Sequence, residues 1–199
     1  MKPGKKSIWL IKLVLHLCSL IPLAWLVIAT VNGHLGADPV EQITHFTGKG
    51  ILHTLFASLM ITPLARWFKL GFLYHFRRLL GLYSFFWATL HMLAYFWFDL
   101  AWEFNLIIGE ITSRNYLVLG MLCWILLLFL SLTSTKGMRS RLGTGWQKLH
   151  NWVYVAAIIG PIHYYWSVKS AVTEPSVYIL LACLLLLARK DKIRRWLVS

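Results

Sequence analysis

The histidines are the residues of this chain whose type and spacing could do chemistry. His150 and His163 fall thirteen residues apart within Trp146–Trp166 (WQKLHNWVYVAAIIGPIHYYW), a stretch with almost no charge. Its length and apolar composition predict one membrane-spanning helix. An ionisable side chain inside a membrane span is costly, so two histidines on one span indicate a functional site. A metal cofactor would use their nitrogen donors.

His91 is the candidate partner of His163. It follows Arg78 by 13 residues, and His163 follows Lys148 by 15 residues, in two stretches expected to run in the same direction. At about 1.5 Å per residue, each side chain lies about 20 to 22 Å into a hydrocarbon core about 30 Å thick. Two neutral imidazoles at matched depth could be the axial ligands of a six-coordinate haem iron, an arrangement suited to electron transfer.

His150 lies at the basic end of the same stretch, about 20 Å from His163 along a helix axis. This position indicates a second, inner redox site. In an ideal helix thirteen residues turn through about 220°, so the two side chains would share a face only if Pro161 bends the helix. His53 and His75 are fallback ligands for the outer and inner site. The other histidines, expected in loops or at the membrane interface, are His16, His34 and His45. A quinone or partner site near the outer surface could include His45.

Six apolar stretches are expected to be the helices that position these histidines, since 58% of the 199 residues are hydrophobic. The predicted spans are about 8–31, 44–65, 79–98, 116–133, 149–168 and 175–188. The predicted fold class is therefore an all-α membrane protein, a six-transmembrane-helix bundle forming a single domain over 1–199. The connections are short and contain no Gly-rich phosphate loop, which argues against a nucleotide-binding domain.

The basic residues fall mainly on one side of the predicted spans. Of the 20 lysines and arginines, 17 fall there, and only Lys49, Arg114 and Lys169 fall on the other side, together with six of the seven acids. The positive-inside rule then predicts cytoplasmic N and C termini. We therefore interpret the net charge of +13 as a signal that orients the chain in the membrane, and not as evidence of nucleic-acid binding. The three cysteines all fall in spans, without a CxxC pair or a CxxCH haem-attachment motif.

Arg77 and Arg78 stand at the basic start of the third predicted span. Their guanidinium groups could pair with haem propionates or with a flavin phosphate. The positive-inside bias by itself also predicts arginine at this position. Both interpretations stay open at the level of the sequence.

Four segments together carry a family resemblance: GADPVEQITHFTG at 36–48, ITPLAR at 61–66, RRLLGLYSFFWATLH at 77–91, and WQKLHNWVY with PIHYYWSVK in the fifth predicted span. With these segments the chain resembles, over essentially its whole length, the ferric-reductase-like transmembrane domain superfamily. Within it, the chain is similar to the haem-binding membrane subunits of bacterial methionine-sulfoxide reductase systems.

The resemblance implies a b-type cytochrome of the bacterial inner membrane, with one or two haems, that passes electrons to a periplasmic molybdopterin methionine-sulfoxide reductase. It implies that His91 and His163 hold an outer haem and that His150 contributes to an inner one. It also makes FMN a candidate cofactor. Relatives of the NADPH-oxidase type have a second histidine fourteen residues before the one matching His91, whereas this chain has Arg77 there. The inner haem is thus left without an assigned second ligand.

The electron donor implied by the resemblance is a cytoplasmic flavin reductase or quinol, because this sequence lacks the flavin and nicotinamide domain of the larger relatives. The chain is expected to be a non-catalytic electron-transfer subunit. One alternative is the cytochrome b subunit of another periplasmic oxidoreductase. An alternative of a different class is a small membrane transporter or scaffold, but transporters often have internal repeats with broken helices, and the sequence shows no such pairing of spans 1 to 3 with spans 4 to 6.

Overall fold

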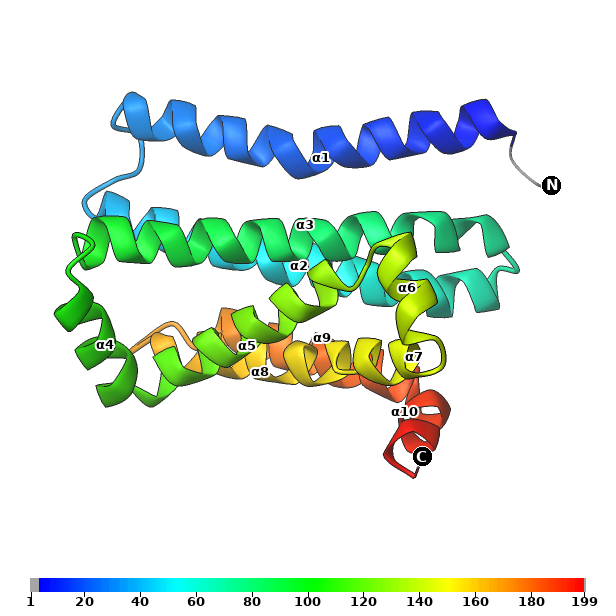
Figure 1. Cartoon of the computed structure of the whole chain (residues 1–199). Helices are drawn as coiled ribbons and strands as arrows, with labels where there is room; N and C mark the ends of the chain where they lie inside the picture. Colours follow the sequence, from blue (N-terminus) through cyan, green and yellow to red (C-terminus); the bar gives the residue numbers. More distant parts are fainter. Residues whose placement is uncertain (1–3, 199) are drawn as a thin grey trace. The chain divides into compact units, whose positions relative to one another are not determined.

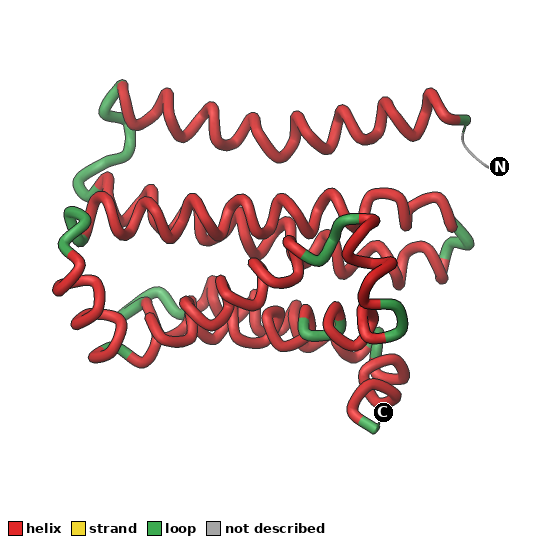
Figure 2. The backbone as a smooth tube through the Cα atoms, viewed as in Figure 1, coloured by secondary structure: helices red, strands yellow, loops and turns green. Residues whose placement is uncertain are grey.

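The computed structural model describes residues 4–198, and this part of the chain contains helices and turns but no β-strand (Figures 1 and 2). The elements are α1 (Lys5–Val31), α2 (Pro39–Trp67), the 3₁₀ turn η1 (Gly71–Leu73), α3 (Tyr74–Ala94), the π-helical turn η2 (Tyr95–Asp99), α4 (Phe104–Ser113), α5 (Asn115–Leu132), α6 (Lys136–Leu142), α7 (Gly145–His150), α8 (Val153–Ser167), α9 (Thr173–Leu187) and α10 (Lys190–Leu197). They form two compact units that divide between Trp102 and Glu103. The all-α prediction is confirmed.

The first unit is built around α2 and α3, which lie side by side and antiparallel (Figure 1). The side chain of Asp38 caps the start of α2 by accepting a hydrogen bond from the Glu41 amide at 2.9 Å. Polar groups join the two helices inside the apolar interface: the Ser58 hydroxyl donates to the Arg77 carbonyl at 3.0 Å, and Ser84 is fully buried. Such bonds hold helices together where no water competes. Helix α1 packs against both.

The second unit is built around α8, which packs against α5 on one side and α9 on the other. Two small residues, Ala156 and Ala157, are completely buried in α8 and allow this close approach. Arg189, at the end of α9, is 3% exposed and donates to the Tyr154 hydroxyl at 3.3 Å. The end of α9 is thereby tied to the start of α8.

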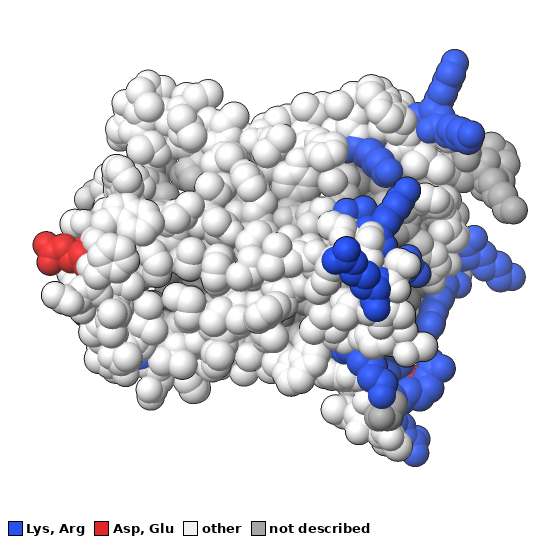
Figure 3. All heavy atoms as spheres, in the orientation of Figure 1, with Lys and Arg blue, Asp and Glu red and all other residues white. Residues whose placement is uncertain are grey.

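Within residues 4–198, three helical segments are long and apolar enough to cross a membrane: Lys5–Val31, Gly71–Asp99 and Asn115–Leu132. The apolar helix Thr173–Leu187 is shorter. Large apolar side chains such as Trp9, Ile21 and Ile28 are more than half exposed on α1, as expected for a surface that meets lipid. In the first unit, lysines and arginines gather at the end that holds the start of α1 and the α2–α3 connection (Figure 3). In the second unit they gather at the end that holds α6, α7 and α10 (Figure 3).

The prediction of one continuous helix over Trp146–Trp166 is wrong. The structure has α7 up to His150, a turn at Asn151 and Trp152, and then α8 from Val153. The buried Asn151 side chain accepts a hydrogen bond from the Gln147 side-chain amide at 2.8 Å. At the turn the Trp152 and Tyr154 amides donate to carbonyls three residues earlier, as in a 3₁₀ turn, at 3.1 and 3.0 Å. Pro161, the predicted site of a bend, lies inside α8.

The connections between the predicted spans also contain short helices. The loop after the third predicted span includes α4, the loop after the fourth includes α6, and the basic tail forms α10. The predicted boundaries of the apolar spans agree with α1, α2, α5 and α9 to within a few residues, except that α2 begins earlier, at Pro39.

We predict that replacing Ala157 with Leu destabilises the second unit, because a larger side chain has no space at a position with 0% exposure. Overpacking of this kind costs about 1 to 3 kcal/mol. The measurement is the melting temperature of the detergent-purified protein. Ala24→Leu on the exposed face of α1 is the matched control and should leave it unchanged. Equal melting temperatures for the two variants would contradict the packing described for α8.

Candidate functional site

His91 lies half-buried in α3 and is held by α2. Its Nδ1 is 2.9 Å from the Thr44 carbonyl oxygen and 3.3 Å from the Thr47 hydroxyl. A carbonyl oxygen only accepts hydrogen bonds, so Nδ1 must carry the proton and Nε2 the lone pair. Thr47 is buried, and its hydroxyl also reaches the Ile43 carbonyl at 2.8 Å. The ring orientation and the tautomer of His91 are therefore set by groups of α2.

His163 lies half-buried in α8 and is held by α5 in the same way. Its Nδ1 donates to the Tyr116 carbonyl oxygen at 2.6 Å, and the ring of Tyr116 lies 6.1 Å from the imidazole, centroid to centroid. The proton is again on Nδ1 and the lone pair on Nε2. In each unit, therefore, Nδ1 of one candidate ligand, His91 or His163, donates to a backbone carbonyl near the start of the helix that it packs against.

This donor set fits a haem iron. Histidines that bind metals almost always donate their second ring N–H to a carbonyl, a carboxylate or water, which fixes the tautomer and raises the basicity of the ligating nitrogen. His91 and His163 both have this arrangement, in which Nε2 is the nitrogen that could bind a metal. Neutral imidazole is the form that binds iron. Within residues 4–198, no group of three or more His, Cys, Asp or Glu side chains could hold a metal ion.

His150 has a different environment at the end of α7. Its Nε2 lies 3.1 Å from the Thr133 hydroxyl, which donates its proton to the Phe129 carbonyl at 2.6 Å. The contact with Thr133 involves Nε2, whereas the carbonyl contacts of His91 and His163 involve Nδ1. Trp146 stacks on the imidazole with 4.0 Å between ring centroids, and its indole N–H donates to the Thr133 carbonyl at 2.9 Å. The end of α5 thus fixes both rings.

The two predicted arginines differ in exposure. Arg77 is half-buried, with its backbone carbonyl bonded to Ser58, and Arg78 is exposed. Of the fallback ligands, His53 is exposed on α2, and the exposed His75 bonds through Nδ1 to the Phe72 carbonyl at 2.9 Å.

The remaining histidines have other partners in the first unit. His16 on α1 bonds to the Tyr83 hydroxyl at 2.5 Å, and this contact ties α1 to α3. His45 lies 3.7 Å from Glu41, and His34 lies in the turn after α1.

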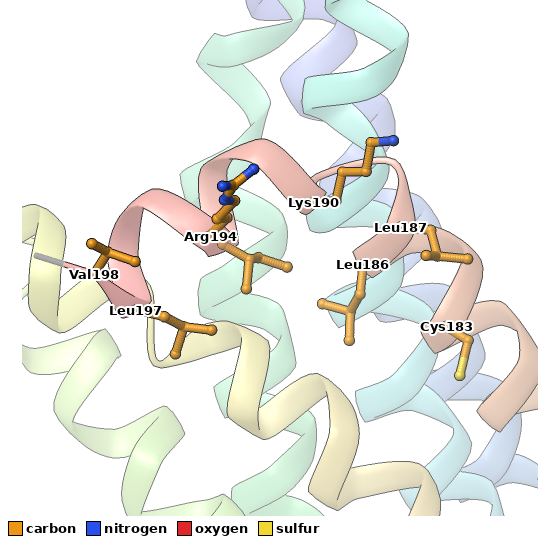
Figure 4. Close-up of a pocket in the computed structure, with 8 residues that line it drawn as sticks. Cys183, Leu186, Leu187, Lys190, Arg194, Leu197 and Val198 are labelled. Atoms are coloured by element: carbon orange, nitrogen blue, oxygen red, sulfur yellow. The ribbon is translucent and has the colours of Figure 1, made fainter.

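A groove lies between α9 and α10, with a volume of about 680 Å³. Leucines of α9 and the side chains of Lys190, Arg194 and Leu197 of α10 line it (Figure 4). None of the predicted ligands borders this groove.

The partners of the histidines were missed by the sequence reading. Thr44 and Tyr116 act through backbone carbonyls, which every residue type has, so no sequence signal marks them. His150, in contrast, is contacted by the side chains of Thr133 and Trp146. The closeness of Trp146 to His150 in the sequence is the only signal that could have predicted either contact.

Comparisons with known proteins agree on one family. Residues 48–161 match the family described as ferric reductase like transmembrane component. No solved structure matches the chain. The chain is 48% identical to "Protein-methionine-sulfoxide reductase heme-binding subunit MsrQ" of Pectobacterium carotovorum subsp. carotovorum (strain PC1), over 94% of both chains. The values for the protein of the same name from Pectobacterium atrosepticum are the same.

A third protein of that name, from Klebsiella pneumoniae (strain 342), is also 48% identical, over 96% of both chains. The similarity therefore extends well beyond the segment that contains the family match. Together with the apolar helices, it makes this chain a multi-pass membrane protein. The chain belongs to the ferric-reductase-like transmembrane components and, within them, to the MsrQ haem-binding subunits.

Proposed function

We propose that this protein is the b-type haem subunit that delivers electrons from the cytoplasmic side or the quinone pool to a periplasmic molybdopterin methionine-sulfoxide reductase, MsrP. The reductase would use these electrons to repair oxidised periplasmic proteins. The observation that carries the proposal is the pair of neutral histidines, each with Nδ1 bonded to a backbone carbonyl of a packed helix. That arrangement is typical of metal ligands.

His91 and His163 are the proposed axial ligands of an outer haem b, each through Nε2. A bound haem b supplies one-electron redox chemistry. The chain's own contribution is to keep both imidazoles neutral and oriented by the hydrogen bonds to Thr44 and Tyr116. These bonds, together with the low dielectric of the membrane, tune the reduction potential.

His150 is proposed to contribute to a second, inner site, and Arg77 and Arg78 to bind haem propionates or a flavin phosphate. The Thr133 hydroxyl, 3.1 Å from Nε2 of His150, would help to orient this ring. Charge pairing of guanidinium with carboxylate or phosphate suits the two arginines. The number of haems is then one or two, with FMN and a quinone as the other cofactor candidates.

The whole chain is proposed to act as one domain of six spans in the bacterial inner membrane, with both termini in the cytoplasm. The distribution of the basic residues supports this orientation. The spans beyond the three long apolar segments would be α2, α7 with α8, and α9. Helix α9 has 15 residues and is about 22 Å long. The basic helix α10 follows it and would lie at the membrane surface. The donor is a cytoplasmic flavin reductase or quinol.

We predict that the detergent-purified protein from haem-replete cells has a Soret band and that its visible bands sharpen on reduction. His91→Ala and His163→Ala should each abolish the same haem signal, because a six-coordinate iron needs both ligands. The measurement is the reduced-minus-oxidised absorption spectrum, normalised to protein.

His53→Ala is the matched control, since His53 is an exposed histidine on a neighbouring helix of the same unit. It should keep the wild-type spectrum. A spectrum that survives loss of either His91 or His163, or that disappears with His53, would show that the pair is assigned wrongly.

We predict that membranes containing this protein and MsrP reoxidise the reduced haem when methionine sulfoxide is added. The physical reason is that the sulfoxide is the terminal electron acceptor in the proposed chain. The measurement is the decay of the reduced haem absorbance in stopped flow. Membranes without MsrP are the control and should show no decay on this time scale; absence of reoxidation with MsrP present would count against it as the partner.

A further inference from the structure

The two halves of the site repeat one local arrangement with a constant offset in the sequence. An offset of 72 residues relates Thr44 to Tyr116 and His91 to His163. In each half the histidine is 47 residues after the residue whose carbonyl accepts its Nδ1–H. The same offset relates Gly48 to Gly120. Both glycines lie one helical turn after the accepting carbonyl, on the same helix as that carbonyl.

The imidazole of each histidine rests against the bare backbone of its glycine. A Cβ at Gly120 would lie 2.8 Å from Cε1 and 3.0 Å from Nδ1 of His163. A Cβ at Gly48 would lie 3.3 Å from Cε1 and 3.4 Å from Nδ1 of His91. A histidine ring held by a hydrogen bond cannot retreat without losing that bond. The tighter fit is thus at His163, and the looser one at His91.

Gly81 in α3 and Gly50 in α2 do not have this relation to a histidine. A Cβ at Gly81 would meet only the Ser58 hydroxyl, at 3.7 Å, which is ordinary contact. A Cβ at Gly50 would meet the ring of Trp87. Close helix packing therefore explains Gly50. It does not by itself explain why two glycines in equivalent positions both contact an imidazole whose Nδ1 is bonded one turn away.

We propose that Gly48 and Gly120 are positioning residues of the haem ligands. Each glycine forms, with the carbonyl one turn before it, what we call a histidine seat. The carbonyl fixes the tautomer of the histidine, and the absence of a side chain at the glycine leaves room for the imidazole ring to approach that carbonyl. This inference rests on the proposed function for the identity of the bound group, whereas the seats themselves rest on contacts within each unit.

The two seats differ in one group. At His91 the Thr47 hydroxyl is a second acceptor near Nδ1, at 3.3 Å, whereas the position 72 residues later is Leu119. The side chain of Leu119 has no hydroxyl group that could accept a hydrogen bond as Thr47 does. The shorter glycine contact makes His163 the more sensitive ligand.

The test compares Gly120→Ala and Gly48→Ala with the control Gly81→Ala. Alanine is a better helix former than glycine, so without a seat all three changes should be neutral or stabilising. We expect Gly120→Ala to lower haem affinity about 10- to 100-fold, the effect typical of losing a group that supports a metal ligand. We expect a smaller loss for Gly48→Ala and none for Gly81→Ala. In the haem that remains, the fraction that binds carbon monoxide on reduction should rise, because a displaced histidine opens an iron position.

A second measurement does not depend on haem. In protein labelled with ¹⁵N-histidine, the reduced wild type should show the Nδ1-protonated tautomer of His163, and Gly120→Ala should shift this signal in the protein with or without haem. The proposal is overturned if both variants keep wild-type haem affinity, carbon monoxide insensitivity and histidine signals, or if Gly81→Ala loses as much haem as they do. If the wild-type protein binds no haem but Gly120→Ala still shifts the His163 signal, the proposed function is contradicted and the seats remain supported.

Discussion

The structure depends on a hydrogen bond between a histidine Nδ1–H and a backbone carbonyl, made twice inside apolar helix pairs. A histidine in a membrane span is costly unless it is neutral and bonded. The carbonyls of Thr44 and Tyr116 provide that bond from helices that are already complete. Because a carbonyl can accept two hydrogen bonds, the histidine is satisfied without breaking the helix that supports it.

This bond requires the helices to be close, and the residues at the interfaces are correspondingly small. In the first unit, α3 approaches α2 across Gly48, Gly50 and the buried Ser84. In the second unit, Ala156 and Ala157 bring α8 against its neighbours, and the Cys123 thiol reaches the Ala156 carbonyl at 3.8 Å. The positions of the histidines and the choice of small residues are thus two parts of one arrangement. Larger residues at these positions would move the imidazoles away from their acceptors.

The sequence was sufficient to predict the apolar helices and the two histidines, because hydrophobic run length and the cost of a buried ionisable group leave strong signals. It could not predict the seats, since their acceptors are backbone carbonyls and their other component is the absence of a side chain at Gly48 and Gly120. The offset of 72 residues was visible in the numbering, but it links single positions and not similar segments. A comparison of whole spans therefore missed it.

The break between α7 and α8 was missed for a related reason. At the break the Trp152 amide donates to the Leu149 carbonyl three residues earlier, while the surrounding residues keep the apolar pattern of a continuous span. The break separates His150 from His163, and the Thr133 hydroxyl and the Trp146 ring contact His150. The two histidines that the sequence places on one helix therefore belong to different environments, and this supports their assignment to different sites.

The central proposal is that His91 and His163 would together hold one haem. Electron paramagnetic resonance, together with near-infrared magnetic circular dichroism of the oxidised, detergent-purified protein, tests it most directly. The account predicts a low-spin ferric haem with two histidine ligands, and the loss of that signature in His91→Ala and in His163→Ala. A high-spin iron, a histidine–methionine ligand pair, or a bis-histidine signature that persists in either variant would contradict it.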